Sequence, residues 1–169
     1  MNRQELREAQ APIKARYREG PTAALVTLTA TGTLDRDDVA CSVETHIGPV
    51  KAGLHPATGG DGTLACSGDM LLQALVACAG VTLRSVATAM DIPVSGTVRA
   101  EGDLDFRGTL GVDREAPVGF EAIRLIFEIS APVSAEQLEK LLQVTERYCV
   151  VYQTLAGGAA MSTILNRAD

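Results

Sequence analysis

The chain has 169 residues, 46% of them hydrophobic, which is enough for one domain with a substantial core over 1–169. Its net charge of -6, its lack of Trp and its 4% aromatic content exclude the basic face and stacking platforms of nucleic-acid binding, so no nucleic-acid partner is expected. Charges run through the first 18 residues, which lack the apolar region of a secretory signal. We therefore expect a cytoplasmic protein whose four cysteines are reduced.

The first predicted element is a helix over 2–19, which makes up an N-terminal segment at 1–20. Apolar side chains recur in it at helical spacing, and Pro12 is a position where the helix could bend or split. Gly20, followed by a proline, ends it.

Three short strands are predicted in the next segment, 23–65. Their alternating and β-branched residues place them at 23–31, 39–45 and 50–55. A glycine-rich loop at 56–63 follows. Because this loop lacks the lysine of a phosphate-binding P-loop, it is predicted to be a plain connection.

A long central helix is predicted over 67–91, with Ser67 as its cap and Asp69 in its first turn. It is apolar nearly all round, apart from one stripe formed by Asp69, Gln73 and Arg84, which fall within about 60° of one another. Such a helix is expected to be enclosed by other elements. Arg84 makes a membrane-spanning interpretation unfavourable, so no membrane association is expected.

The C-terminal segment, 97–169, is predicted to hold a sheet and a helix. Alternation of apolar and polar residues gives strands over 97–105 and 121–130. Three glycines and a proline make the stretch between them, 107–119, a loop.

The last long helix begins at Ser134, which forms a capping box with Gln137, and its apolar face ends at Cys149. One further strand is predicted in the tail, at 161–165. The order β-β-β-α-β-β-α predicts an α+β fold with antiparallel sheet around a buried helix.

Two of the four cysteines are predicted to point into the interior. Cys78 lies in the middle of the central helix, and Cys149 lies 71 residues later at the end of the last helix. A disulfide could join them if their Cα atoms approach within about 7 Å. Buried cysteine is more often a small hydrophobic filler, so these residues alone leave both interpretations open.

The sequence around these cysteines resembles that of the OsmC/Ohr family, the osmotically inducible protein C and organic hydroperoxide resistance proteins. The likeness covers about 23–165 and is strongest over 68–155. Its most specific points are a cysteine deep in an apolar helix, here Cys78 in ALVACAG, and a second cysteine closing the last long helix, here Cys149 in ERYCVVYQTL.

The resemblance implies an intertwined homodimer in which antiparallel sheets wrap a long central helix, with two active sites at the interface. It implies reduction of organic hydroperoxides, with Cys78 as nucleophile and Cys149 as its disulfide partner. An arginine from the loop between the first two strands, here Arg36, would hold the thiolate. A dithiol, such as a lipoylated protein, would restore both thiols, and no cofactor is implied.

One departure from the family concerns the glutamate that peroxidase members usually carry ten residues before the nucleophile. Gly68 stands at that position here. Asp69 is adjacent but lies about 180° round the helix from Cys78. Asp69 is therefore a candidate accessory residue, and so is Cys66, a possible alternative resolving thiol just before the helix.

Two other kinds of function stay open on the sequence. One is a family-like dimer that binds a small apolar ligand without turning over peroxide, and the other is a different thiol-dependent reductase or transferase. Cys41 is predicted to be packing, and the spacing of His46 and His55 does not indicate a metal site. The sequence has no GxSxG elbow, which disfavours hydrolase chemistry.

Overall fold

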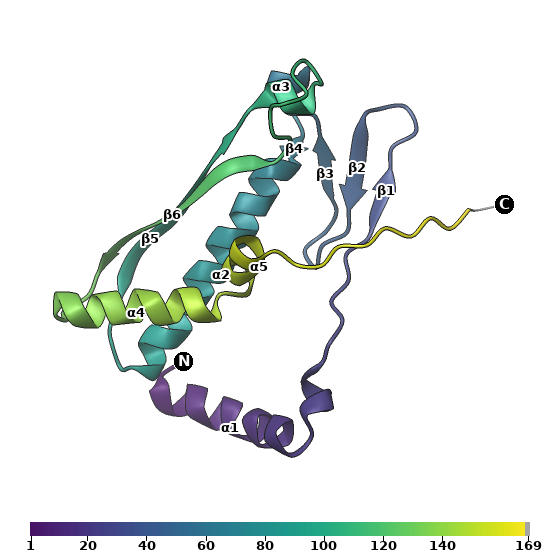
Figure 1. Ribbon diagram of the computed structural model, residues 1–169. Coiled ribbons are helices and arrows are strands. Elements are labelled where there is room, and N and C mark those ends of the chain that lie inside the picture. Colours follow the sequence, from purple (N-terminus) through teal and green to yellow (C-terminus); the bar gives the residue numbers. More distant parts are fainter. Residues whose placement is uncertain (168–169) are drawn as a thin grey trace.

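The computed structural model describes residues 1–167, which form a mixed α+β fold around one long helix (Figure 1). The elements in chain order are α1 (Arg3–Glu19), a 3-10 helix (Pro21–Ala24), β1 (Gly32–Leu34), β2 (Ala40–Val43), β3 (Val50–Gly53), a second 3-10 helix (Pro56–Thr58), β4 (Ala65–Cys66), α2 (Ser67–Ala89), β5 (Ser95–Leu104), α3 (Phe106–Thr109), β6 (Phe120–Ser130), α4 (Ala135–Tyr148) and α5 (Val150–Gly157). The predicted α+β class is confirmed.

The N-terminal helix forms as predicted. Asn2 and Glu5 cap α1 reciprocally, with each side chain accepting a hydrogen bond of 2.9 Å from the other residue's backbone N–H. The helix continues through Pro12 and ends at Gly20, its C-cap. α1 packs against α2 at the end of the molecule opposite α3 (Figure 1).

The strand predicted at 23–31 is wrong. Pro21 starts a 3-10 helix instead, and the chain then runs extended without a partner strand until β1, which lies between the strands predicted at 23–31 and 39–45. The apolar side chains of this stretch lie open, with Leu25, Val26 and Leu28 at least 70% exposed. A strand needs a neighbour to receive its backbone hydrogen bonds, and one copy of the chain supplies none here.

The strands predicted at 39–45 and 50–55 are found as β2 and β3, within one four-stranded sheet of order β1-β2-β3-β4. β1, β2 and β3 pair antiparallel. β4 lies in a stretch for which no strand was predicted and pairs parallel with β3 through Gly53 and Cys66. It leads without a break into α2 (Figure 1).

The central helix is found with slightly different ends. Ser67 is the first residue of α2 and not its cap, because Cys66 occupies the cap position and makes no side-chain hydrogen bond there. The C-terminal end lies at Ala89, before the predicted 91, because Asp91 takes a left-handed conformation with φ of 59°. Asp is one of the few residues that adopt this conformation at small cost.

In one chain α2 is enclosed on one side. Its buried stripe consists of Leu75, Ala79, Leu83 and Ala87. The predicted polar stripe is exposed, and Arg84 donates a 2.8 Å hydrogen bond to the carbonyl of Val94. A further apolar strip remains open, including Leu71 and Val81, the latter 73% exposed. By length and composition alone α2 could cross a membrane, a test that core helices also pass.

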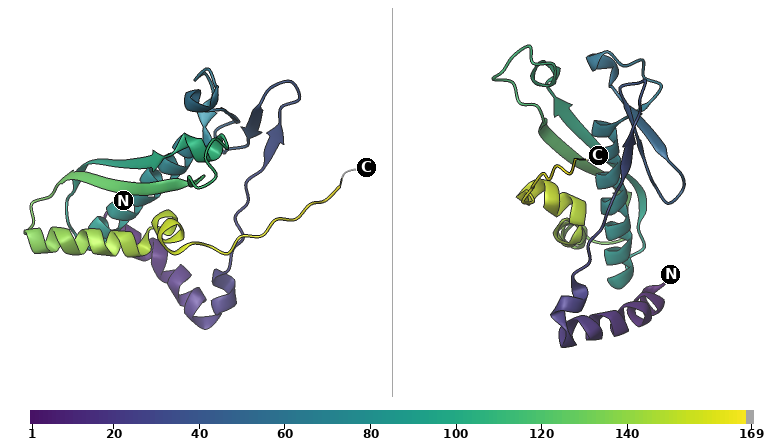
Figure 2. Two further views of the ribbon diagram at one scale, coloured as in Figure 1. Left: turned by 45° about the horizontal axis from the view of Figure 1, so that its top comes forward. Right: turned by 90° about the vertical axis from the view of Figure 1, so that its right-hand side faces the viewer.

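The other two predicted strands are found as the antiparallel pair β5–β6, whose register runs from Ser95 opposite Ser130 to Leu104 opposite Phe120. One face of this pair packs on α2 (Figures 1 and 2). The predicted loop between them contains the short helix α3 at its start.

The last long helix is confirmed, with Ser134 and Gln137 forming the predicted capping box. Its fully buried Leu141 joins Leu83, Ala87 and Ile92 in one core cluster. The tail differs from the prediction, because a further helix, α5, follows α4 at once and the strand at 161–165 does not form. Beyond α5 the chain extends away from the body (Figure 1).

Candidate active site

The candidate site lies where the corner between α4 and α5 meets the middle of α2. Cys149 forms that corner: its extended conformation, with φ of -76° and ψ of 107°, makes it both the C-cap of α4 and the N-cap of α5. Its N–H donates to the carbonyl of Thr145, and its carbonyl accepts from the N–H of Gln153, both at 2.9 Å. The corner is therefore fixed by hydrogen bonds on both sides, and the Cys149 side chain is fully buried.

The corner brings the two cysteines together, although they are 71 residues apart in sequence. Cys149 forms a buried cluster with Leu75 and Ala79 of α2, and Cys78 packs against this cluster. The thiol of Cys149 lies close enough to the Cys78 sulfur to act on its pKa as a hydrogen-bonding neighbour. All four cysteines are free thiols in this structure.

Three further groups near the Cys78 sulfur lower the pKa of its thiol as hydrogen-bond donors. Two are the backbone N–H groups of Val150 and Val151, which belong to the first turn of α5 and have no acceptor within the helix. The third is the hydroxyl of Thr82, one turn further along α2. A helix N-terminus carries partial positive charge, so this arrangement favours an anion on Cys78.

The two thiols have pKa values shifted in opposite directions. Burial raises the pKa of Cys78, but the hydrogen bonds from Val151, Cys149, Val150 and Thr82 outweigh it, so the pKa lies below its ordinary value. Burial also raises the pKa of Cys149, and the neighbouring Cys78 raises it further, against two opposing hydrogen bonds from the N–H groups of Tyr152 and Val151. Of the pair, Cys78 is therefore the thiol that ionises first.

The two accessory candidates lie at the other end of α2. Cys66 precedes Cys78 by 12 residues and Asp69 precedes it by nine, which place them about 18 Å and about 14 Å away along the helix axis. Both line a separate cavity of about 500 Å³ together with Phe106 and Phe120. One chain does not bring either of them to Cys78.

Arg36 is also not brought to Cys78 within one chain. It lies exposed in the loop between β1 and β2 and is not among the groups that shift the pKa of Cys78. At Gly68, where the family's glutamate would stand, a Cβ atom would lie 3.4 Å from Cζ of Phe120 and 3.6 Å from the Cys66 sulfur. Aromatic packing thus occupies the surroundings of this position.

Cys41 and His55 make packing and hydrogen-bond contacts that stabilise the fold. Cys41 is half-buried in β2, and its sulfur packs against the backbone of Gly32. His55 accepts a hydrogen bond from the N–H of Ala57 and stacks on Phe106 with ring centroids 4.9 Å apart. Within residues 1–167 no cluster of three or more His, Cys, Asp or Glu side chains could hold a metal ion.

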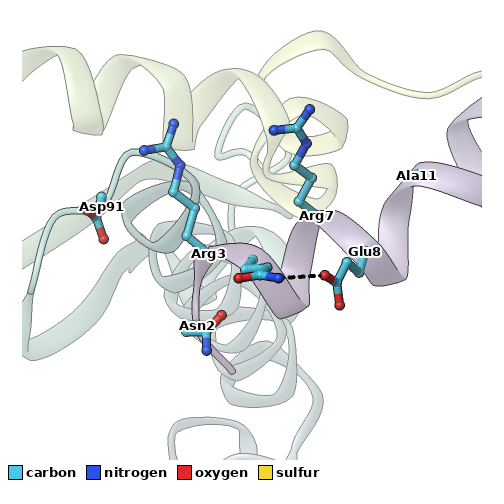
Figure 3. A pocket seen from close by; sticks show the side chains of 7 residues that line it. Asn2, Arg3, Arg7, Glu8, Ala11 and Asp91 are labelled. Carbon is cyan, nitrogen blue, oxygen red and sulfur yellow. Dashed lines mark hydrogen bonds between the residues drawn. The ribbon is translucent and has the colours of Figure 1, made fainter.

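A groove of about 700 Å³ lies between α1, α2 and α4, beside the cysteine pair but not lined by either cysteine. Thr82 lines it, and so does Tyr148, the neighbour of Cys149. A different hollow, of about 710 Å³, is lined by the first turns of α1 and by Asp91, just past the end of α2 (Figure 3). Arg3 and Arg7 project side by side there, and its lining includes neither a cysteine nor a residue that adjoins Cys78 or Cys149, so it does not bear on thiol chemistry.

Sequence reasoning missed three groups of this site. Val150 and Val151 act through their backbone N–H groups, which leave no mark in the side-chain pattern. Thr82 could have been found, because a hydroxyl four residues after Cys78 lies on the same helix face.

Fold and site together define a class of protein in which a thiol pair lies between a central helix and the corner that packs on it. A family model described as OsmC-like protein matches residues 60–163. The chain belongs to the OsmC-like family.

Solved structures show the same fold. An OsmC-like protein from Mycoplasma pneumoniae superposes with a TM-score of 0.65 at 20% identity, covering 79% of this chain and 89% of that one. An organic hydroperoxide resistance protein from Elizabethkingia anophelis gives 0.59 at 18% identity, covering 80% and 91%. The organic hydroperoxide resistance protein OhrB of Bacillus subtilis gives 0.54 at 18% identity, covering 80% and 94%. A comparison with curated protein sequences gave no match.

Proposed function

We propose that this protein is a thiol peroxidase that reduces organic hydroperoxides to alcohols, with Cys78 as nucleophile and Cys149 as resolving thiol. The observation that carries the proposal is the contact between a buried Cys149 thiol and a Cys78 sulfur that accepts hydrogen bonds from the first turn of α5. Structural likeness to two organic hydroperoxide resistance proteins supports the substrate class.

The chemistry follows from the two thiols. The Cys78 thiolate attacks the distal oxygen of the hydroperoxide, the O–O bond breaks, and Cys78 becomes a sulfenic acid. Cys149 then attacks the sulfenic sulfur, and the resulting disulfide is reduced by an external dithiol, such as a lipoyl group. The apolar lining of the neighbouring groove, which includes Val81, Val86 and Val144, favours an alkyl or aryl hydroperoxide over hydrogen peroxide.

We also propose that the working form is a cytoplasmic homodimer whose second copy covers the face on which Cys78 lies. Apolar side chains are open around the cysteine pair, with Val81 73%, Tyr148 63% and Val150 71% exposed. The unpaired stretch before β1 and the extended tail, which includes the exposed Leu165, offer further apolar surface to a partner. Arg36 would reach Cys78 from such a second copy, while Cys66 and Asp69 have no part in this mechanism.

A thiol count tests the function. The fully reduced protein is mixed with one equivalent of cumene hydroperoxide, and free thiols are titrated after the peroxide is removed. We expect wild type to lose two thiols and Cys78→Ser to lose none, with Cys41→Ser as a matched control that still loses two. An unchanged count in wild type would refute the peroxidase. It would favour a protein that binds a small apolar ligand. The cavity of about 500 Å³ could hold such a ligand, and Gly68 in place of the family's glutamate agrees with a protein that does not turn over peroxide.

A further inference from the structure

The contact between Cys78 and Cys149 allows the pair to hold one proton between them. Two thiolates in contact repel, so ionisation of one thiol opposes ionisation of the other. The N–H groups of Val150 and Val151 favour the anion on Cys78, whereas Cys149 is fully buried beside it and has its pKa raised. Cys78 is therefore the first of the pair to ionise, and the buried thiol of Cys149 lies in the cluster against which Cys78 packs.

Reduction of a hydroperoxide by Cys78 releases a leaving group that must take up a proton close to this sulfur. When the thiolate takes the distal oxygen, the O–O bond breaks and the other oxygen leaves as an alkoxide, a far stronger base than a thiolate. Of the groups that contact the Cys78 sulfur, the backbone amides and the Thr82 hydroxyl are very weak acids, and the Cys149 thiol is the most acidic. These contacts supply no carboxylic acid, imidazolium or ammonium group.

We propose that the Cys149 thiol protonates the departing alkoxide, so that Cys149 is a catalytic acid in the first step before it becomes the resolving nucleophile in the second. This inference rests on the proposed peroxidase function. It adds a role in the peroxide-cleaving step, which a purely resolving thiol does not have.

The atoms balance across both steps. In the first, the Cys78 thiolate gains the distal O–H oxygen and is oxidised to a sulfenic acid, the hydroperoxide is reduced, and the alkoxide takes the proton of Cys149 and leaves as an alcohol. In the second, the Cys149 thiolate so formed attacks the Cys78 sulfur and displaces hydroxide, which gives the disulfide. Loss of the proton in the first step thus produces the thiolate that the second step needs.

The experiment compares two oxidants that differ in their leaving group. Cumene hydroperoxide releases an alkoxide that needs a proton, and peracetic acid releases a carboxylate that does not, because carboxylic acids have pKa values near 4. The rate of Cys78 oxidation in a single turnover is measured for wild type, Cys149→Ala and the nearly isosteric Cys149→Ser by rapid quench and mass spectrometry. The quantity compared is the ratio of the two rates, since a change in the amount of Cys78 thiolate alters both rates equally.

We expect both variants to lower the ratio of the cumene hydroperoxide rate to the peracetic acid rate by about a hundredfold, the lower end of general acid catalysis. A ratio equal to that of wild type in Cys149→Ser would overturn the inference and leave Cys149 as a resolving thiol only. Failure of the proposed function looks different, because wild type itself would then leave Cys78 unoxidised by cumene hydroperoxide. Melting curves of all three proteins check that the variants are folded.

Discussion

The hydroxyl of Thr82 can be removed with little change of shape, which makes it a sensitive probe of the candidate site. In Thr82→Val the hydrogen bond to the Cys78 sulfur is lost while the side-chain volume is nearly kept. A typical hydrogen bond contributes about 0.5–1.5 kcal/mol net. Because the Thr82 hydroxyl has the smallest effect among the groups that act on the pKa of Cys78, we take the lower end, and at 1.36 kcal/mol per pKa unit this corresponds to about half a unit.

The sign follows from which form the hydroxyl stabilises. It donates to the thiolate, so its loss disfavours the anion and raises the pKa of Cys78. The assay is the rate of alkylation by iodoacetamide as a function of pH, followed by mass spectrometry of the peptide that contains Cys78. The midpoint of the rate profile should move upward by about half a pH unit in Thr82→Val.

A matched control is available on the same helix. Ser85 lines the same groove as Thr82 but is not among the groups that shift the pKa of Cys78, so Ser85→Ala should leave the midpoint in place. An unmoved midpoint in Thr82→Val would refute the account of how this thiolate is stabilised. The same profile for Arg36→Ala tests the arginine, because an upward shift is expected only if Arg36 reaches Cys78 from a second copy.

Two further predictions concern the core and the proposed dimer. Leu141→Ala removes a fully buried side chain from the contact between α2 and α4 and should lower the free energy of unfolding by about 2–5 kcal/mol in denaturant titration. Gln143→Ala, exposed on the same helix, should change it by no more than about 0.5 kcal/mol, and equal losses in both variants would contradict the assignment of the core. Val81→Asp places a charge on the open apolar strip of α2 and should shift the protein from dimer to monomer in light scattering, whereas Gln73→Asp on the polar stripe should not. A wild-type monomer would remove the basis for the proposed dimer.

Most helices and the β5–β6 pair could be predicted from the sequence because their signals are local. The capping box of Ser134 and Gln137 fixes the start of α4, and strict alternation fixes the two long strands. The apolar pattern of 23–31 also resembles a strand, but a strand forms only with a neighbour, and that condition is not local. The same reason explains the wrong strand at 161–165.

The candidate site was predicted in part. Cys78 and Cys149 were singled out by their helix faces and by the family resemblance, and the structure brings them together. The sequence did not reveal that Cys149 ends one helix and begins another, because the break at this residue is conformational. The sequence did offer a signal for the end of α5, the glycine pair at 157–158, because Gly158 has a positive φ of 66° just past the last residue of that helix.

The bend at Cys149 has a mechanical consequence. The backbone of this single residue joins α4 to α5, while its sulfur faces the helix on which both rest. A covalent bond from this sulfur to α2 would therefore add a constraint to the corner between α4 and α5 and reduce the motion of α5 relative to α4. Amide hydrogen exchange in Val150–Gly157 would then slow on oxidation and recover on reduction, so the stiffness of one short helix would report the redox state of the protein.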